Sequence, residues 1–403
     1  MKVLHVIPSV SPLRGGPSKA VLQMVQALCE QGIEAAIVTT NDDGDGLLDV
    51  PLNEWLAYPS DAPVPVRFFP RFSPPIPAIR EFAFSGALAT WLWQHIAEYD
   101  LVHVHAIFSC SSTIAMTIAR LQNVPYVVRP LGQLCHWSLQ QGNRKKQLYL
   151  NLIERANLNH AQAIHFTSEQ EQQEAVALGL NAPGFVLPHG LVMPSLLPDA
   201  KVRLRETLDL PADEPIILFL SRLHPKKGLD YLIPALSQLQ EHHFTFVLAG
   251  NATPDYEIEI QQLLESAGLT ACTRRMGFVT GEQKALLLQG SDLFALTSHS
   301  ENFGIAVLEA MANGLPVLIT PGVALASLVE RSHLGWVTPL EQEAIVATLE
   351  LLFKQPALLQ EVGNRAQTIV RQQYTWNHIA TSLIQQYQST LQPQMLVFSR
   401  QTH

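Results

Sequence analysis

Segments typical of β-strands alternate with segments typical of α-helices along most of this 403-residue chain. Such alternation is typical of parallel sheets with helical crossovers. The expected strands of the first half are KVLHVI, EAAIVTT, VPVRFF, LVHVHA, PYVVR, AIHFT and FVLP, and those of the second half are PIILFL, FTFVLAG, LFALTS and LPVLIT. Helical patterns between them cover residues 19–30, 144–159, 230–240, 256–266, 282–289 and 304–313. We therefore expect an α/β protein built on parallel sheets.

The chain is too long for one ordinary core and suits two domains. Residues 188–215 contain the proline-rich stretch PHGLVMPSLLPDAK, which loses the periodicity of its neighbours, as a linker would. We expect an N-terminal domain over 1–195 and a C-terminal domain over 196–374. The last helical pattern, 375–391, follows a complete second domain, and we expect it to pack back onto the first.

Composition and charge exclude several classes of protein. A hydrophobic fraction of 47% indicates a globular chain, and a net charge of -9 argues against a general nucleic-acid binder. The four cysteines are far apart and have no metal or redox spacing, which favours reduced thiols in the cytoplasm. No window approaches 18 apolar residues, so no membrane span is expected. The basic run Arg144-Lys145-Lys146 is either a solvated helix start or a contact with lipid headgroups at the inner membrane face.

Ligands of open parallel sheets bind beyond the carboxyl ends of the strands, so the residues that follow each strand carry the most information. SVSPLRGGP follows the first strand, and Gly15 and Gly16 would let the backbone approach a phosphate at the start of the next helix. The stretch is not the G-x-G-x-x-G of dinucleotide sites, and a plain turn is an equally good interpretation.

Two histidines share one face of the strand in LVHVHA. His105 stands at its carboxyl end, where functional residues gather, whereas His103 is expected to be structural. Histidines at this spacing can bind a metal ion, but no third ligand is evident nearby in the sequence, so we predict no metal site.

The second domain has a basic stretch after its first strand, FLSRLHPKKGLDYL. Arg222 and Lys227 would both lie close to a helix N-terminus, which already favours anions. Gly228 would allow a close backbone approach. A diphosphate would suit this arrangement, although an exposed basic loop is the common alternative.

Two glutamates, Glu301 and Glu309, stand in SHSENFGIAVLEAMANG, whose helix is apolar on nearly every face. A buried carboxylate needs a partner, so Glu309 should accept hydrogen bonds from a ligand or from neighbouring groups. Eight helical residues span about 12 Å, too far for the paired carboxylates of a glycosidase. The two would instead suit the two ends of a long polar ligand, with the amides of Phe303, Gly304 and Ile305 facing an anionic middle.

Together, RGGP, RLHPKKG and SENFGIAVLEAMANGLPV resemble the family-4 retaining glycosyltransferases, and the resemblance runs in order over nearly the whole chain. It implies the GT-B fold, with two Rossmann-like domains facing a central cleft. It also implies that Arg222 and Lys227 bind the donor diphosphate in place of a metal, so that no cofactor is required. Glu301 would contact the donor sugar, and Glu309 the ribose.

The resemblance assigns further residues. Amides of Asn302 to Ile305 would contact the sugar and phosphates, Gly15 and Gly16 would flank the diphosphate, and His105 would hydrogen-bond the sugar near the reacting carbon. VVRPLGQLCHW resembles members that act in bacterial surface polysaccharide synthesis, which would place Arg129, His136 and Trp137 beside the acceptor.

The sequence therefore predicts a metal-independent retaining glycosyltransferase that moves a sugar from a nucleotide sugar to a glycan or lipid-linked acceptor. We expect a cytoplasmic protein, with peripheral contact at the inner membrane face as a further option. A nucleotide-sugar epimerase of the same fold and a non-catalytic nucleotide-sugar-binding protein are the alternatives.

Overall fold

The computed structural model describes residues 1–76, 80–140, 143–239 and 242–392. The chain forms two compact units, each with its own sheet. The first contains Met1–Gly190 and helix α17 (Trp376–Leu391), and the second is Leu191–Thr375. The change of unit after Gly190 falls inside the linker that the sequence predicts and slightly before residue 195.

The N-terminal unit is built on an eight-stranded sheet of order β10-β9-β8-β7-β1-β2-β6-β5, parallel except for β5. Its strands are β1 (Lys2–Val6), β2 (Glu34–Thr40), β5 (Trp55–Tyr58), β6 (Val64–Phe69), β7 (Leu101–His105), β8 (Tyr126–Arg129), β9 (Ala163–Phe166) and β10 (Gly184–Val186). A small hairpin of β3 (Asp42–Asp43) and β4 (Gly46–Leu47) lies outside it. All seven strands that we predict for this half are present.

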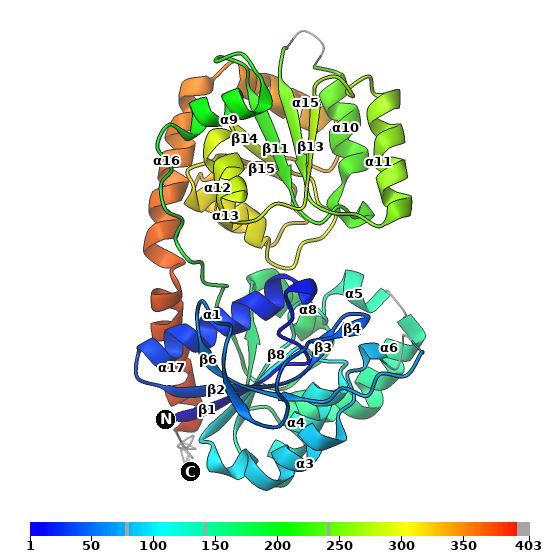
Figure 1. Cartoon of the computed structure of the whole chain (residues 1–403), viewed down its shortest axis with the longest axis vertical. Coiled ribbons are helices and arrows are strands. Elements are labelled where there is room, and N and C mark those ends of the chain that lie inside the picture. The colour runs from blue at the N-terminus through cyan, green and yellow to red at the C-terminus, as the bar shows by residue number, and fades with distance from the viewer. Residues whose placement is uncertain (77–79, 141–142, 240–241, 393–403) are drawn as a thin grey trace, which may run out of the picture. The chain divides into compact units, whose positions relative to one another are not determined.

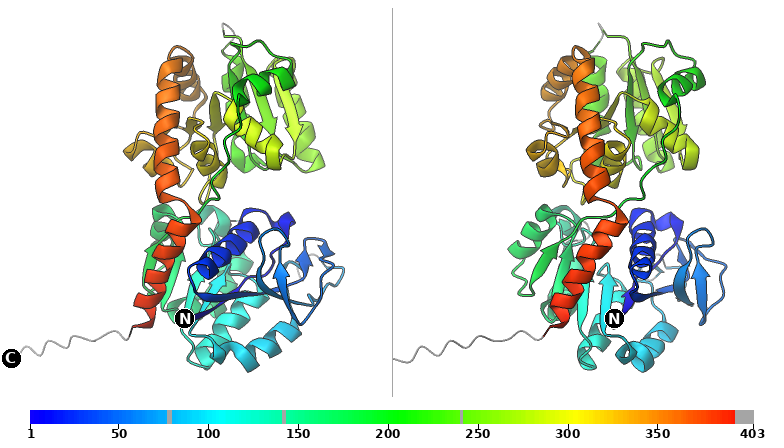
Figure 2. Two further views of the ribbon diagram at one scale, coloured as in Figure 1. Left: turned by 60° about the vertical axis from the view of Figure 1, so that its left-hand side comes forward. Right: turned by 90° about the vertical axis from the view of Figure 1, so that its left-hand side faces the viewer.

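Helices cover both faces of this sheet. Its central strands β7 and β8 are therefore buried at every residue. One face packs against α1 (Gly16–Glu30) and α17, through residues such as Met24 and Tyr387. The other packs against α3 (Gly86–His95) and α4 (Cys110–Leu121). Figure 2 shows α17 beside α1, as their contacts require and as predicted for the last helix. The remaining helices are α5 (His136–Gln140), α6 (Asn143–Tyr149), α7 (Arg155–Asn159) and α8 (Glu169–Ala177), with a π-helical turn at Leu150–Glu154 between α6 and α7.

The C-terminal unit has a six-stranded, fully parallel sheet of order β13-β12-β11-β14-β15-β16. Its strands are β11 (Ile216–Leu220), β12 (Thr245–Ala249), β13 (Thr273–Gly277), β14 (Leu293–Leu296), β15 (Val317–Ile319) and β16 (Gly335–Val337). Its helices are α9 (Ala200–Leu208), α10 (Leu229–Ser237), α11 (Pro254–Ser266), α12 (Gly281–Gly290), α13 (Ile305–Ala312), α14 (Ala326–Arg331), α15 (Gln342–Phe353) and α16 (Pro356–Gln373). In Figure 1, α10 and α11 lie on one side of this sheet, and α12 and α13 on the other.

Three strands of the two main sheets escape the sequence prediction for physical reasons, as does the β3-β4 hairpin. Strand β5 is a half-exposed edge strand of four residues, and β16 has only three. Strand β13 reads TRRMG, and its two arginines hide the apolar pattern. Short or polar edge strands lack the continuous apolar run that identifies a buried strand.

Each sheet reverses its winding direction at one position. In the N-terminal unit β1 lies between β2 and β7, and in the C-terminal unit β11 lies between β12 and β14. Ligands of open α/β sheets bind at such switch points, outside the carboxyl ends of the two strands. The stretches singled out in the sequence follow β1 and β7 in one unit and β11 and β14 in the other. No helix among the described residues is long and apolar enough to cross a membrane.

Candidate functional site

The loop after β11 carries the two predicted cations. Arg222 is exposed, and Lys227 ends a 3₁₀ turn, Pro225–Lys227, which begins at His224. The His224 side chain accepts a hydrogen bond from the Lys226 amide (3.1 Å) and so holds the turn. Burial lowers the pKa of His224, and the positive charges of Arg222, Lys226 and Lys227 lower it further. The loop is therefore electropositive and rigidly formed.

Gly228 joins this loop to the one that follows β14. Its φ of 68° lies in the left-handed region, and a Cβ atom at this position would overlap the Thr297 carbonyl oxygen. The Thr297 hydroxyl in turn donates to the Gly228 carbonyl (2.8 Å), and the His299 amide donates to the Lys226 carbonyl (2.9 Å). The two loops are thus joined through their backbones.

We expect Gly228→Ala to destabilise the C-terminal unit by about 2 kcal/mol or more, because it adds a steric overlap to an unfavourable φ. Gly268→Ala is a matched control: its φ is 69°, but nothing lies within 4 Å of the added carbon. Urea unfolding of both variants isolates the effect of the Thr297 contact. Equal losses of stability in the two would show that the contact does not matter.

Glu301 lies in the loop after β14 and forms an ion pair with Lys227. The Glu301 backbone is held on both sides, since its amide donates to the Gly322 carbonyl (2.7 Å) and its carbonyl accepts from the Ala324 amide (3.0 Å). Both charged side chains remain partly exposed, at 12% for Lys227 and 22% for Glu301. The structure therefore brings together a cation and a carboxylate that lie 74 residues apart in the sequence, with surface left for a ligand.

Helix α13 begins immediately after this loop. Its N-cap residue is Gly304, with a φ of 89°, and no side chain caps the helix start. The first turn also contains no acidic residue. The amide groups at Phe303, Gly304 and Ile305 stand at the positive end of the helix dipole, where an anion is favoured. The helix start lies where the sequence predicts it, and the binding of an anion there stays a prediction.

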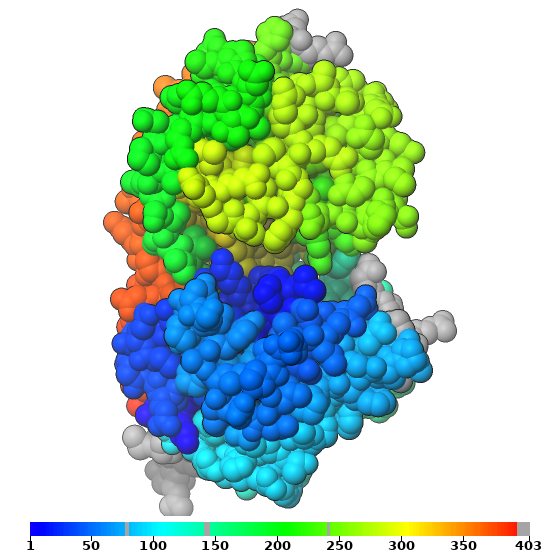
Figure 3. Space-filling model, in the orientation of Figure 1, coloured from blue at the N-terminus to red at the C-terminus, as the bar shows by residue number. Residues whose placement is uncertain are grey.

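Glu309 has a partner that sequence analysis missed. Lys284 of α12 donates to both of its carboxylate oxygens, at 2.7 and 2.6 Å. Helix α13 is largely buried, as predicted, but the Glu309 side chain remains 16% exposed and Lys284 26%. Figure 3 shows the surface over α12 in yellow-green. The need for a partner was evident from the sequence, whereas the choice of Lys284 follows only from the packing of α12 against α13.

The RGGP loop of the N-terminal unit is held by a network of charges. Asp42 is buried between Arg14 and Arg71, and the Arg14 guanidinium donates to its two oxygens at 2.6 and 2.9 Å. Burial opposes ionisation of Asp42, but the hydrogen bonds and charge of these arginines outweigh it and lower the pKa of Asp42. Gly15 has a φ of 77° with open space around it, and the start of α1 has no side-chain cap. The Gly15 amide donates to the Pro12 carbonyl (3.0 Å), so this residue offers an anion room for a close approach and not its own amide.

His105 belongs to a buried cluster of histidines. Its ring is hydrogen-bonded to His5 (Nε2 to Nδ1, 3.0 Å), and His103 is hydrogen-bonded to the Tyr387 hydroxyl of α17 (2.6 Å). The nitrogen atoms of His5, His103 and His105 lie within 4.8 Å of one another. The third ligand that is not evident near this pair in the sequence is thus present in the fold, because β1 pairs with β7 and places His5 opposite His103.

The cluster is held in its neutral form. Burial lowers the pKa of His5 to about 3, and burial also lowers the pKa values of His103 and His105 well below their usual range. The positive charge of Arg129 adds to each shift. Ala106 and Phe108, in the loop that follows His105, have positive φ values of 66° and 57°. Such backbone is costly for residues other than glycine and is concentrated at functional sites.

The three residues predicted to border an acceptor lie in different environments. Arg129 is fully buried and donates to His189 (3.0 Å), while burial lowers its pKa to about 10. His136 is exposed at the start of α5, and Trp137 is half-buried. Arg129 therefore holds His189 inside the unit, and only the other two have accessible surface.

Comparison with known families covers most of both units. Residues 15–190 match the Glycosyl transferase 4-like domain, and residues 201–369 match the model named Glycosyl transferases group 1. The chain belongs to the group 1 glycosyltransferase family. The matched ranges include every candidate residue described above.

Curated members of the family are distant in sequence. The chain is 29% identical over 196 residues to an uncharacterized glycosyltransferase of Methanocaldococcus jannaschii. This match covers 48% of this chain and 50% of that protein. It is 27% identical over 268 residues to a D-inositol 3-phosphate glycosyltransferase of Corynebacterium jeikeium, covering 63% of each. The similarity thus spans about half to two thirds of these relatives. A D-inositol 3-phosphate glycosyltransferase of an Arthrobacter species is matched over 94% of its length, at 23% identity.

Solved structures confirm the fold. Anabaena HepE in complex with UDP and glucose superposes with a TM-score of 0.75 at 22% identity, over 96% of this chain and all of that one. The sucrose-phosphate synthase of Thermosynechococcus elongatus gives a TM-score of 0.77 at 20% identity, over 96% and 99% of the two chains. The predicted architecture of two Rossmann-like domains is therefore confirmed.

Proposed function

We propose that this group 1 family member is a metal-independent retaining glycosyltransferase, which transfers a sugar from a nucleoside diphosphate sugar to a glycan or lipid-linked acceptor. The observation that supports this most strongly is the joined pair of loops at the switch point of the C-terminal unit. There Lys227 and Glu301 are paired beside the uncapped start of α13. A cation and the backbone amides of a helix start suit phosphates, and a carboxylate beside them suits sugar hydroxyls.

The donor would extend along α13. Its diphosphate would bind Lys227, Arg222 and the amides from Asn302 to Ile305, and its sugar would bind Glu301. Glu309 would accept hydrogen bonds from the ribose hydroxyls, with Lys284 holding its carboxylate in place. HepE, which shares the fold, is described in complex with UDP and glucose, and this supports a uridine donor as the first to test.

Catalysis would depend on the departing diphosphate. As the bond to the sugar breaks, negative charge grows on the phosphate, and fixed positive groups stabilise that charge more strongly than the ground state. Lys227 and Arg222 would supply this positive charge without a metal ion. We propose a same-face displacement assisted by the leaving phosphate, which retains the anomeric configuration.

The N-terminal unit is proposed to bind the acceptor. His136 and Trp137 have accessible surface there, and His105 stands at the carboxyl end of β7 beside strained backbone. The neutral His105 ring would hydrogen-bond the sugar, and Gly15 and Gly16 would flank the diphosphate. Arg129 would act as a positioning residue, through the histidines that it contacts.

Peripheral contact with a membrane forms part of this proposal. Leu148, Leu152 and Ile153, close to Lys146, are 61, 70 and 40% exposed. The side chains of Arg144 and Lys145 lie outside what the structure describes. Exposed apolar side chains beside a basic residue suit a lipid surface, as a lipid-linked acceptor in surface polysaccharide synthesis would require. The reaction would then take place at the inner face of the membrane.

Incubation of the protein with UDP-, GDP- and ADP-sugars tests the proposal directly. With one of these donors and an oligosaccharide or polyprenyl-linked acceptor, we expect a product that keeps the anomeric configuration of the donor, as read by NMR. Excess EDTA should leave the rate unchanged. An isomerised sugar formed without acceptor would indicate an epimerase instead, and tight donor binding without any product would indicate a binding protein.

A further inference from the structure

The C-terminal unit contains a cavity of about 570 Å³ at the edge of its sheet opposite the candidate site. Ile216, Leu293 and Pro316 line it at the amino ends of β11, β14 and β15. Arg222, Lys227 and Glu301 instead follow the carboxyl ends of these strands. The cavity is therefore separate from the proposed donor site, and its size is typical of pockets for small molecules.

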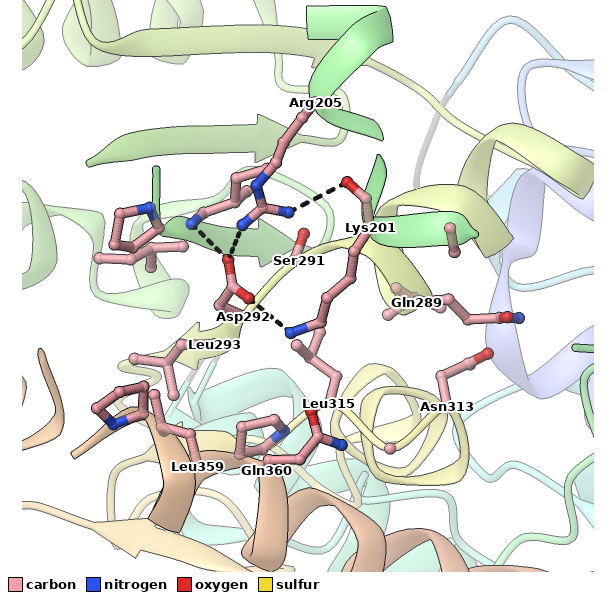
Figure 4. A pocket seen from close by; sticks show the side chains of 18 of the residues that line it. Lys201, Arg205, Gln289, Ser291, Asp292, Leu293, Asn313, Leu315, Leu359 and Gln360 are labelled. Atoms are coloured by element: carbon pink, nitrogen blue, oxygen red, sulfur yellow. Dashed lines mark hydrogen bonds and ion pairs between the residues drawn. The ribbon is translucent and has the colours of Figure 1, made fainter. Parts of the chain in front are cut away.

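The charges that line the cavity compensate one another. Asp292 accepts hydrogen bonds from Lys201 (2.8 Å) and Arg205 (2.6 Å), and Figure 4 shows it between the two. With Asp199 and Asp213, the lining has three carboxylates against two cations, a net charge of -1. A phosphate or carboxylate ligand is not favoured by such a lining, which differs in this respect from the site at Lys227.

Three residues of the lining nevertheless carry buried polar atoms without a partner. Arg205 Nε, Ser291 Oγ and Asn313 Oδ1 are buried and have no hydrogen-bond partner within the described residues. Arg205 and Ser291 are only 7 and 3% exposed as whole residues. A buried polar atom without a partner is costly, so each of these favours a ligand that supplies one.

The chemistry of these groups points to hydroxyls. Arg205 Nε can only donate, Asn313 Oδ1 can only accept, and the Ser291 hydroxyl can do both. Leu352, Phe353 and Leu359 provide an apolar wall beside them. A mixture of neutral donors and acceptors next to an apolar surface suits the hydroxyl groups and C–H faces of an uncharged sugar.

Helix α13 connects this cavity to the donor site. Asn313 ends the helix, and its side-chain amide donates to the Glu309 carbonyl (2.8 Å). Glu309 is the residue proposed to bind ribose, and its partner Lys284 lies on α12, which also places Gln289 in the cavity lining. A ligand that bonds to Asn313 would therefore act on the helix that carries the proposed ribose contact.

We propose that this cavity is a second binding site for an uncharged mono- or disaccharide, and that its occupation changes nucleotide affinity through α13. The second part rests on the proposed function, whereas the first does not. The site would let the sugar supply of the cell adjust the use of the nucleotide donor.

Saturation-transfer NMR with glucose, sucrose, trehalose and maltose tests binding to the intact protein. Asn364→Trp would fill the cavity from α16, where Asn364 is exposed and lines it. Gln372→Trp is the control, since Gln372 is an exposed residue of the same helix outside the lining. We expect transfer to at least one sugar in the native protein and the control variant, and its loss in Asn364→Trp.

Undiminished transfer in Asn364→Trp would place the sugar elsewhere and overturn the proposal, as would the absence of transfer to all four sugars. The coupling is tested by titrating UDP with and without the bound sugar. We expect the dissociation constant of UDP to change about 5-fold or more in the native protein and not in Asn364→Trp. Equal constants would refute the coupling. UDP that fails to bind even without sugar would count against the proposed function and leave the sugar-binding result standing.

Discussion

Lys227→Ala should lower the rate of sugar transfer by about 10²- to 10³-fold, the loss typical when one group that stabilises a developing anion is removed. The reason is that Lys227 stands in the joined loops at the switch point and would face the phosphate that departs. The loss should appear mainly in kcat, because the charge on the phosphate grows as the bond breaks. Initial rates at saturating donor provide the measurement.

Lys227 also neutralises Glu301, and this second role can be separated from the first. If Lys227 acted only by pairing with Glu301, the double variant Lys227→Ala/Glu301→Gln would be as active as Glu301→Gln alone. We expect it to remain far slower. Lys226→Ala, next in the chain, is the positional control and should retain most of the activity. Near-normal turnover of Lys227→Ala would contradict the assignment.

The N-terminal unit should lose stability steeply as the pH falls below 6.5. Its five buried histidines, His5, His103, His105, His165 and His189, all have lowered pKa values, chiefly because of burial. Below pH 6.5 the unfolded chain takes up protons at these rings and the folded unit does not. The free energy of unfolding therefore decreases as the pH decreases. Each ring that stays neutral contributes about 1.4 kcal/mol per pH unit. All five together would contribute up to about 7 kcal/mol per pH unit.

Tryptophan fluorescence can follow this unit selectively. Five of the six tryptophans belong to it, and Trp336→Phe removes the one in the C-terminal unit, which has no buried histidine among the residues described. Urea unfolding at pH 7 and pH 6 gives the slope. The unfolded ring goes from about one quarter to about three quarters protonated between these two pH values, so His165→Gln should reduce the slope by about 0.7 kcal/mol per pH unit. His160→Gln, at an exposed position, should not change it. A slope near zero would show that the histidines are protonated in the folded unit.

Much of the fold could be predicted from the sequence because the buried strands are short apolar runs between helical patterns. KVLHV, IILFL and LFAL all became central strands. The strands of the two sheets that were missed, β5, β13 and β16, are all edge strands, where one side of the strand is not enclosed. An apolar run in the sequence identifies a buried strand, and these three segments are too little buried to have one.

The candidate residues of the second unit were also predictable, because each follows a strand that the pattern locates. Arg222 and Lys227 follow β11, and Glu301 follows β14. The contacts between these residues were not predictable from the sequence. That β14 lies next to β11, rather than beyond β13, decides that Lys227 meets Glu301.

The sequence by itself determined the alternation of strands and helices, the linker near Gly190, the helix that begins near Gly304 and the need of Glu309 for a partner. These properties depend on residues near one another in the chain. Only the tertiary structure decided that the partner is Lys284, that His5 joins His103 and His105, and that Arg129 is buried behind them. Those contacts join strands and helices through the order of the sheet and the packing of its faces, which no local pattern specifies.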